Sequence, residues 1–355
     1  MEDMAVRRPD PVFWNGRRVL ITGHTGFKGA WLAVVLFQLK ADVIGIALEP
    51  PTDPSIFRLL DVQSNLEHHI IDIRSRSQLI ERVKACSASV VFHLAAQSLV
   101  RRSYRDPALT FDVNVNGTIN VLDAIRNTST VETVVAVTSD KVYRNDGSGR
   151  KFTENDPLGG RDPYSASKAA AEIAISSWRA SFADELPRVV SARAGNVIGG
   201  GDFAEDRLVA DIWRAVNNNR PLSVRYPEAT RPWQHVLDVL IGYLLFAEDA
   251  VGNPSVEPTL NFGPLDNKET SVRDFITEFG ESFGVSVPCH YSQSVELPEA
   301  PRLGLNSQLA ARHLRWEPVY NQTQAIEKTA HWYRAYRAGE DIGRLSVEQV
   351  RQVLQ

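Results

Sequence analysis

Short apolar runs alternate with longer amphipathic segments through the first half of the chain. The apolar runs lie at 19–22, 43–48, 69–71, 90–94, 134–138 and 189–194. Helical patterns fall between them, at 29–40, 76–86, 108–127 and 163–182. Runs with few polar residues are typical of parallel strands that helices cover on both faces. The pattern therefore predicts an α/β fold, a Rossmann-type doubly wound parallel sheet completed by the strand at 189–194, with ligands at the carboxyl ends of its strands.

The pattern changes after Asn196. A glycine-rich break at 199–201 is followed by a stretch rich in tryptophan, proline and arginine, and then by further helical patterns. These patterns lie at 208–218, 236–249, 272–283 and 322–337, with a possible terminal helix at 346–355. We expect a Rossmann domain at 1–195 and a smaller, mostly α-helical lobe at 196–355 that binds the substrate, with some of its segments returning to the sheet.

Composition narrows the class of protein and its surroundings. The chain has 355 residues and a formal net charge of −4, so it lacks the basic surplus of a nucleic-acid-binding protein. Its two cysteines cannot form a disulfide framework. The longest apolar run, 30–37, is too short to span a bilayer, and the N-terminal residues do not resemble a signal peptide. We expect a cytoplasmic protein with no nucleic-acid or membrane partner and no metal in its site.

A glycine-rich turn follows the first apolar run directly. The run 23–29 reads GHTGFKG, with glycines at Gly23, Gly26 and Gly29 and with Thr25 and Phe27 between them. Between a strand and a helix, such a turn directs backbone N–H groups and a helix N-terminus at a pyrophosphate. The GxxGxxG spacing resembles that of the short-chain dehydrogenase/reductase superfamily, and we predict a bound dinucleotide.

Further cofactor contacts are expected at the ends of the next strands. Asp72 and Ile73 follow the third strand, where the acid would bond the adenine amino group. The fourth strand ends in small residues that let a cofactor approach the backbone: Leu94, Ala95, Ala96 and Gln97. These positions line the carboxyl edge of the predicted sheet.

The choice between NAD and NADP depends on the end of the second strand. Glu49 lies 20 residues past Gly29, where an acid that binds the ribose hydroxyls is expected. This favours NAD. The alternative is that the two prolines after Glu49 turn it away and that Arg58 or Arg74 meets a 2′-phosphate.

Tyr164 and Lys168 lie four residues apart, and hence on one face of the predicted helix. The pKa of a free phenol is about 10, so an unassisted Tyr164 is a poor base. A nearby ammonium and the nicotinium charge would favour the phenolate, which can accept a hydroxyl proton while hydride leaves the same carbon. Ser139, at the end of the fifth strand, supplies a hydroxyl that can bond the same substrate oxygen.

Asp140 and Lys141 follow the same strand end, where substrate chemistry takes place in such sheets. A plain oxidation needs only the hydroxyl, the phenol and the lysine. An additional acid–base pair indicates a second proton transfer. The residues leave open which of the two is the acid and which the base, because a close pair titrates jointly.

Taken together, these runs resemble the nucleotide-sugar 4,6-dehydratases of the extended short-chain dehydrogenase/reductase group, and in particular their CDP-glucose branch. The resemblance rests on the runs 23–29, 48–52, 93–97, 138–143, 193–202 and 231–237. Dehydratases of the dTDP type usually carry Asp-Glu where this chain has Asp140 and Lys141. Beyond residue 297 the match loosens, and 301–306 departs from the branch's pattern.

The resemblance implies an NAD-dependent lyase that converts CDP-D-glucose to CDP-4-keto-6-deoxy-D-glucose and assembles as a homodimer or homotetramer. It also implies that Asn196, Arg207 and Arg231 contact the diphosphate of the substrate. Two other functions remain open. A sugar-nucleotide 4-epimerase would share Tyr164 and Lys168 but needs no acid–base pair, and a non-catalytic sensor of dinucleotide redox state typically lacks the Tyr/Lys pair.

Overall fold

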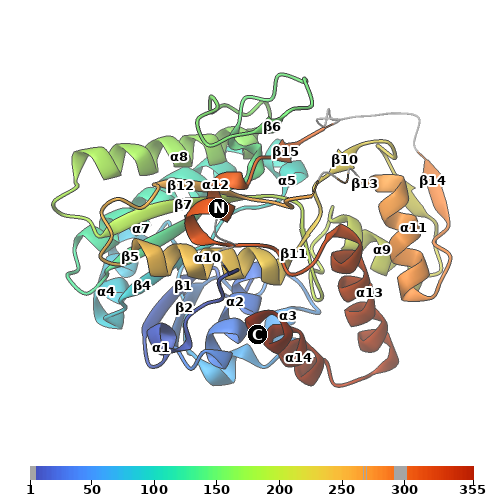
Figure 1. Ribbon diagram of the computed structural model, residues 1–355, viewed down its shortest axis with the longest axis horizontal. Coiled ribbons are helices and arrows are strands. Elements are labelled where there is room, and N and C mark those ends of the chain that lie inside the picture. Colours follow the sequence, from blue (N-terminus) through green and yellow to red (C-terminus); the bar gives the residue numbers. More distant parts are fainter. Residues whose placement is uncertain (1–4, 267, 269, 292–301) are drawn as a thin grey trace.

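The computed structural model describes residues 5–266, 268, 270–291 and 302–355 (Figure 1). Two sequence expectations rest partly on residues outside this range. The one about the N-terminus involves residues 1–4, and the one about the loosening family match involves Leu297 and Pro301. The strands are β1 (Arg18–Thr22), β2 (Asp42–Ala47), β3 (Glu67–Ile70), β4 (Val90–His93), β5 (Thr133–Val137), β6 (Lys151–Phe152), β7 (Arg188–Ala194), β8 (Val197–Ile198), β9 (Leu222–Val224), β10 (Thr230–Arg231), β11 (Gln234–His235), β12 (Thr259–Phe262), β13 (Thr270–Ser271), β14 (Cys289–Tyr291) and β15 (Gly304–Leu305).

The helices alternate with these strands in the first half of the chain and dominate the second half. They are α1 (Pro11–Trp14), α2 (Phe27–Gln38), α3 (Ile56–Leu59), α4 (Arg76–Cys86), α5 (Val100–Arg105), α6 (Pro107–Phe111), α7 (Gly117–Arg126), α8 (Pro163–Ser181), α9 (Leu208–Asn217), α10 (Val236–Ala250), α11 (Val272–Phe283), α12 (Gln308–Leu314), α13 (Gln322–Ala338) and α14 (Ile342–Leu354), with 3₁₀ turns η1 (Val62–Asn65) and η3 (Asp140–Val142) and a π-helical turn η2 (Asp112–Asn116). In the described part of the chain, no helix is both long and apolar enough to cross a bilayer.

The central sheet confirms the predicted doubly wound α/β fold. Seven parallel strands of the described chain pair in the order β12-β7-β5-β4-β1-β2-β3. The chain moves outward from β1 to β3 and then crosses back to β4, so the strand order reverses between β1 and β4. A crevice for a ligand is expected at the carboxyl ends of those two strands.

One sequence prediction about this sheet was wrong. β7 does not complete it, because β12 pairs with β7 at the edge, with Leu260 opposite Ala192. β12 carries the polar Asn261 between two apolar residues, so no continuous apolar run marks it. The helix predicted over 108–127 is confirmed as a continuous helical stretch, in which the π-helical turn η2 joins α6 and α7. The predicted domain boundary between residues 195 and 196 stays a prediction. α10 and β12 come after this boundary in the sequence, and both pack on the sheet.

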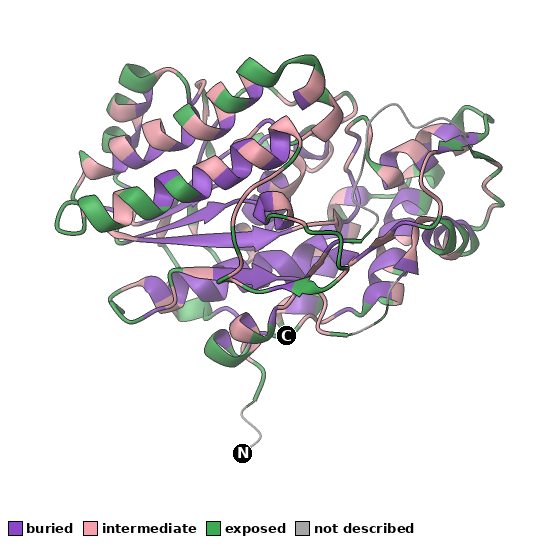
Figure 2. Cartoon of the chain, turned by 90° about the horizontal axis from the view of Figure 1, so that it is seen from above, coloured by how far each residue is buried: buried purple, intermediate pink, exposed green. Residues whose placement is uncertain are grey.

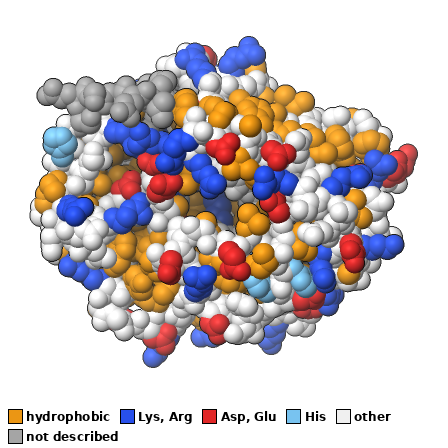
Figure 3. All heavy atoms as spheres, turned by 180° about the vertical axis from the view of Figure 1, so that it is seen from behind, with side chains coloured by type: hydrophobic (Ala, Val, Ile, Leu, Met, Phe, Trp, Pro, Cys, Tyr) orange, Lys and Arg blue, Asp and Glu red, His pale blue; other side chains and the backbone are white. Residues whose placement is uncertain are grey.

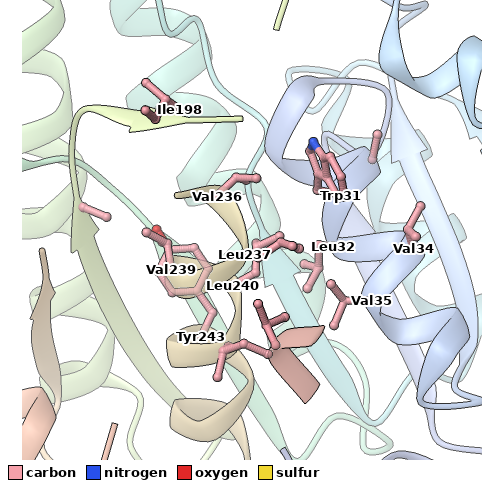
Figure 4. Packing of buried hydrophobic residues seen from close by; sticks show 14 of the residues in the cluster. Trp31, Leu32, Val34, Val35, Ile198, Val236, Leu237, Val239, Leu240 and Tyr243 are labelled. Carbon is pink, nitrogen blue, oxygen red and sulfur yellow. The ribbon is translucent and has the colours of Figure 1, made fainter. Parts of the chain in front are cut away.

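Alternate residues of each strand enter two different cores. Val19 and Ile21 of β1 pack toward α2 and α10, whereas Leu20 packs toward α4 and α7. This alternation follows from the pleat, which sends successive side chains to opposite faces. Figure 2 shows the buried sheet between helices whose outer surfaces are exposed. Figure 4 shows the contact between α2 and α10, made by Trp31, Leu32, Val35, Val236, Leu237 and Leu240.

The second half of the chain forms a smaller helical region beside the carboxyl edge of the sheet, with α9, α11 and α13 (Figure 1, right). Aromatic rings hold it together: Phe203, Trp213, Trp332, Tyr333 and Tyr336 make mutual contacts with centroids 5.2–6.4 Å apart. Aromatic contacts of this kind provide large apolar area in a small region. The carboxyl ends of the strands therefore face a well-packed second region.

Candidate active site

The glycine-rich turn lies against the end of β4. Gly23 has φ +83°, and a Cβ there would lie 2.7 Å from the backbone nitrogen of Ala95. Only glycine adopts this conformation at this distance without strain. Gly26 precedes α2 as its N-cap, and no side chain caps the helix. The first N–H groups of a helix have no intrahelical acceptor, so those of Phe27 and Gly29 are available to an anion.

These features fit the pyrophosphate of a dinucleotide at the crevice between β1 and β4. The uncapped helix end and the close approach of the turn to β4 form a cradle for it. Thr25 stabilises the turn, since its hydroxyl donates to the Leu48 carbonyl at 2.8 Å. When bound, NAD would lie across this edge of the sheet, with its pyrophosphate at the start of α2.

Glu49, the predicted ribose ligand, is exposed just past the end of β2. Its carboxylate lies 4.0 Å from the Arg58 guanidinium, which also lies 3.9 Å from Asp53. Arg74, the other candidate for a 2′-phosphate, makes hydrogen bonds of 2.6–3.1 Å to Asp72. Both arginines therefore have carboxylate partners, which disfavours a 2′-phosphate at either of them.

The predicted adenine contacts have partners within the protein. The hydrogen bonds from Arg74 hold the pKa of Asp72 below its ordinary value. The Ile73 side chain is buried against Gly117 of α7. Gln97 turns its amide into the protein, donating to the Leu99 carbonyl and to Thr110, both at 3.0 Å. Of the run from Leu94 to Gln97, only the backbone and the small side chains are left for a cofactor.

Asn114, in the π-helical turn, is a residue that the sequence analysis missed. Its amide accepts from the Gln97 N–H at 2.8 Å and donates to the Gln97 carbonyl at 3.0 Å and to Ser167 at 2.9 Å. It thereby ties the loop after β4 to α8, which carries the predicted catalytic pair. Asn114 is one of several polar residues in this helical pattern, so nothing in the sequence singled it out. π-Helical turns often occur at functional sites.

Tyr164 and Lys168 lie in the first two turns of α8, both buried. The side chain of Asp162 caps this helix. The Ser139 hydroxyl forms a hydrogen bond with the Tyr164 phenol, which places it where it can meet the same substrate oxygen. The Lys168 ammonium donates to the Val137 carbonyl at the end of β5, at 3.2 Å. The structure therefore brings the three predicted oxidation residues together.

Burial sets the pKa values of this pair in the protein alone. Burial raises the pKa of Tyr164, while its hydrogen bond with Ser139 and the charge of Arg207 oppose that rise. Burial also lowers the pKa of Lys168 to about 8, opposed by the carboxylate of Glu172. Desolvation has this effect because it disfavours the charged form of both groups. The expectation that the ammonium and the nicotinium charge together favour the phenolate concerns the site with its cofactor bound, and it stays a prediction.

A buried ion pair lies beneath the catalytic strand end. Glu172 accepts hydrogen bonds from Arg193 at 2.8 Å and from the Thr138 hydroxyl at 2.5 Å. Thr138 therefore points away from the site, and Ser139 is the hydroxyl beside Tyr164. Since the Glu172 carboxylate raises the pKa of Lys168, it stabilises the charged form of the lysine. The sequence analysis assigned no role to Glu172.

The side chains of Asp140 and Lys141, both in the η3 turn, have different surroundings. Asp140 is 1% exposed and accepts hydrogen bonds from Ser139 at 3.0 Å and from Asn196 at 3.1 Å. A side chain at Gly195 would overlap the Asp140 carboxylate, so glycine is required there for the close approach. Lys141 instead lines the neighbouring cavity. The carboxylate is thus held in place, while the lysine faces the space available to a substrate.

This cavity has a volume of about 490 Å³, in the usual range for a small-molecule site. It is lined by Lys141 together with the three residues that the sequence assigned to a diphosphate: Asn196, Arg207 and Arg231. Arg207 donates to the Ser98 carbonyl at 3.0 Å, and Arg231 to the Thr230 carbonyl at 2.8 Å. On the face seen in Figure 3, Lys and Arg side chains, with Asp and Glu side chains among them, surround a central hollow. Lys141, Arg207 and Arg231 in the cavity wall give an anionic ligand cationic groups to meet.

Comparison with known proteins agrees with this geometry. Residues 19–279 match the model of the NAD dependent epimerase/dehydratase family. The chain is 38% identical over 340 residues to the CDP-glucose 4,6-dehydratase of Salmonella typhimurium, covering 94% of this chain and 95% of that protein. It is 26% identical over 331 residues to a probable dTDP-glucose 4,6-dehydratase of Sinorhizobium fredii, covering 89% and 92%.

Solved structures share the fold. A dTDP-glucose 4,6-dehydratase of Bacillus anthracis in complex with NAD superposes with a TM-score of 0.75 at 21% identity, covering 93% of this chain and 99% of that one. A UDP-glucose 4-epimerase of Brucella ovis in complex with NAD gives 0.76 at 24% identity, covering 90% and 98%. At these identities the likeness concerns the fold, which epimerases and dehydratases share.

Proposed function

The chain belongs to the NAD dependent epimerase/dehydratase family, and from that premise we propose that it is a lyase that dehydrates CDP-D-glucose to CDP-4-keto-6-deoxy-D-glucose. One observation carries the proposal: the Asp140 and Lys141 pair stands at the end of β5 beside Ser139 and Tyr164. An epimerase has no use for a second acid–base pair there. The curated CDP-glucose 4,6-dehydratase that matches over 94% of this chain supports the choice of nucleotide.

The first step is oxidation at C4 of the hexose. NAD, when bound, accepts hydride from C4 and later returns it to C6. The Tyr164 phenolate takes the proton of the C4 hydroxyl, and Ser139 holds the same oxygen. Lys168 holds the ribose next to the nicotinamide and favours the phenolate once the site is filled. The residues proposed to bind the cofactor are Gly23, Thr25, Gly26, Phe27, Gly29, Glu49, Asp72, Ile73, Leu94, Ala95, Ala96, Gln97, Tyr164 and Lys168.

The second step is elimination across C5 and C6. The C4 ketone acidifies the proton on C5, and the C6 hydroxyl then leaves as water. Lys141, which faces the cavity, takes the C5 proton and gives a proton back to C5 when hydride returns to C6. Asp140, held by Ser139 and Asn196, protonates the departing oxygen. The reverse assignment, or a shared proton, is the alternative within this proposal.

The diphosphate of the substrate is proposed to bind Asn196, Arg207 and Arg231, all of which line the cavity. Asn196 already donates to Asp140 at 3.1 Å, so it also couples the substrate site to the elimination acid. We further propose a cytoplasmic homodimer or homotetramer. The exposed Phe111 and Ile173, on the contacting helices α6 and α8, are apolar side chains that such an interface would cover.

The cofactor is expected to be regenerated in every turnover. Purified protein given CDP-glucose and substoichiometric NAD should convert all of the substrate, because the hydride taken from C4 returns to C6. The product is a base-labile 4-keto sugar that absorbs near-ultraviolet light, and free NADH should not accumulate. Turnover that consumes one NADPH for each product would contradict this cycle.

Replacing Arg231 by lysine is expected to weaken CDP-glucose binding about tenfold, although the charge is kept, because the bidentate guanidinium contact is lost. The measurement is the dissociation constant by calorimetry, with Arg102→Lys on the exposed surface of α5 as the matched control. Wild-type affinity in Arg231→Lys would show that this residue does not bind the diphosphate.

Equal catalytic efficiency with dTDP-glucose and CDP-glucose would contradict the cytidine preference and leave the dehydratase class intact.

A further inference from the structure

Arg193 of β7 and Glu172 of α8 form a buried ion pair that no step of the proposed reaction uses. Their charged groups lie 2.8 Å apart, and their side chains are 6% and 2% exposed. Taking two charges out of water is so costly that apolar residues of similar volume often stabilise a protein equally well. Stability alone is therefore a weak reason for this pair, and the groups that it binds indicate a different role.

One member of the pair holds the start of the catalytic turn, residues 139–141 after β5. The Glu172 carboxylate accepts a hydrogen bond from the hydroxyl of Thr138, directly before this turn, at 2.5 Å. It also accepts a hydrogen bond from Ser191 of β7 at 3.0 Å. The start of the catalytic turn is thereby tied to both α8 and β7.

The other member of the pair holds the far end of the turn, at Tyr143. The Arg193 guanidinium donates to the Tyr143 phenol oxygen at 2.9 Å, and the phenol donates to Asn261 at 2.6 Å. Burial raises the pKa of Tyr143 to about 12, so the phenol keeps the proton that it donates. Arg193 and Asn261 lie opposite each other on β7 and β12, so both partners of the phenol belong to the sheet.

β7 also leads to the residue that holds Asp140. Asn196, two residues after the end of β7, donates to the Asp140 carboxylate at 3.1 Å. Side chains at alternate positions of a strand point to one face of the sheet, which is why Ser191 and Arg193 both reach Glu172. The catalytic turn is therefore restrained at three points by β7 and the residues next to it.

The position of the Lys141 side-chain nitrogen depends on the backbone of this turn. Across the described ranges of the chain, no hydrogen bond or ion pair joins that nitrogen to another residue. The backbone N–H of Lys141 is fixed, since it donates to the Ser139 hydroxyl at 3.2 Å. Where the nitrogen lies in the cavity is thus set by the conformation of the turn that carries it.

Building on the proposed function, we propose that Arg193 is a positioning residue for the elimination step, and that Tyr143 carries its restraint to Lys141. The ion pair holds the two ends of the turn, at Thr138 and Tyr143, and the turn then presents Lys141 to C5. Placement matters because a displacement of about 1 Å can cost a reacting group about 10²-fold in rate. C4 oxidation depends less on this restraint, since its base and its lysine lie on α8.

Tyr143→Phe tests the proposal with little change in packing. The phenyl ring can keep its stacking on Phe152, at 5.1 Å, and its contact with the guanidinium, at 5.0 Å. Arg193 keeps its hydrogen bonds to Glu172 and to the Glu154 carbonyl. In single turnovers of CDP-glucose, formation of the 6-deoxy product should slow about tenfold to a hundredfold. Formation of bound NADH should keep its wild-type rate, so bound NADH accumulates.

Arg193→Lys tests the same connection from its other end. Lysine keeps a charge beside Glu172 but lacks the guanidinium fork that also reaches Tyr143. It should slow elimination and spare oxidation, and adding Tyr143→Phe should change little further, because both variants break one connection. Tyr243→Phe, in another buried phenol, is the matched control and should leave both rates unchanged. If Arg193→Lys does not fold, Tyr143→Phe decides by itself.

Hydrogen exchange of the free protein measures the restraint without substrate. The amides of residues 139–143 should exchange about tenfold faster in Tyr143→Phe than in the wild type, the effect of one lost hydrogen bond on local opening. Unchanged exchange there, or a wild-type ratio of the two rates in Tyr143→Phe, would overturn the inference. If the wild type forms no 6-deoxy product, the proposed function fails, and hydrogen exchange still decides whether Tyr143 restrains the turn.

Discussion

Replacing Tyr164 by phenylalanine is expected to lower kcat by about 10²- to 10⁴-fold, the usual contribution of a general base. The phenol is buried on α8 and hydrogen-bonded to Ser139, so the variant removes one proton acceptor and little packing volume. Affinity for CDP-glucose should change little, because the lost contact matters mainly in the transition state. Steady-state kinetics together with calorimetric binding of the substrate would separate the two effects.

Tyr243 provides the matched control for this variant. It is a buried phenol in the neighbourhood of Tyr164 and Asp140, and its hydroxyl has no hydrogen-bond partner in the described part of the chain. Tyr243→Phe removes the same atom from the same neighbourhood and should leave kcat near the wild-type value. If Tyr164→Phe turned over at a rate close to that of Tyr243→Phe, the base for C4 oxidation would have to be another group.

Replacing Lys141 by alanine is expected to block the reaction after oxidation and before elimination. C4 would still be oxidised, because Ser139, Tyr164 and Lys168 are intact, and the enzyme would accumulate bound NADH and the 4-keto-hexose. Release of the 6-deoxy product should fall by about 10²- to 10⁴-fold. Single-turnover absorbance of bound NADH, with chemical analysis of the sugar, measures the two halves on the same sample, so oxidation is the internal control.

Asp140→Asn tests the other member of the pair. The amide keeps the size of the carboxylate and can still meet Ser139 and Asn196, but it cannot protonate the departing C6 oxygen. Product released by the wild type in deuterated water should carry deuterium at C5. If both variants released 6-deoxy product at wild-type rates, the elimination would have to use other residues, and the main argument against an epimerase would be lost.

Local sequence determined the features that depend on residues close together in the chain: the strands, the glycine-rich turn and the face shared by Tyr164 and Lys168. Apolar runs predicted six of the seven sheet strands, because a strand buried on both faces must be apolar at nearly every residue. The glycine-rich turn at Gly23 was also predicted from sequence, since a backbone with positive φ this close to a neighbouring strand requires glycine. Tyr164 and Lys168 share a helix face through their spacing alone.

Tertiary structure decided which groups act on one another. The sequence placed Ser139 at the site because it follows the fifth strand, but only the fold shows why Thr138 is not the hydroxyl there. Glu172, 34 residues from Thr138, accepts a hydrogen bond from the Thr138 hydroxyl and leaves Ser139 for Tyr164. The spacing of Tyr164 and Lys168 reveals a neighbouring charge, but only the fold shows that both groups lose water and that burial raises the pKa of Tyr164.

Arg193 shows the same limit most clearly. In the sequence it is one charged residue of the strand run 189–194, and its neighbours there are uncharged. Its partners Glu172 and Tyr143 are 21 and 50 residues away, and they meet it only because α8 and the turn after β5 pack beside β7. Backbone conformation follows from local residue types, whereas hydration, charge and hydrogen-bond partners depend on segments that only the packed fold brings together.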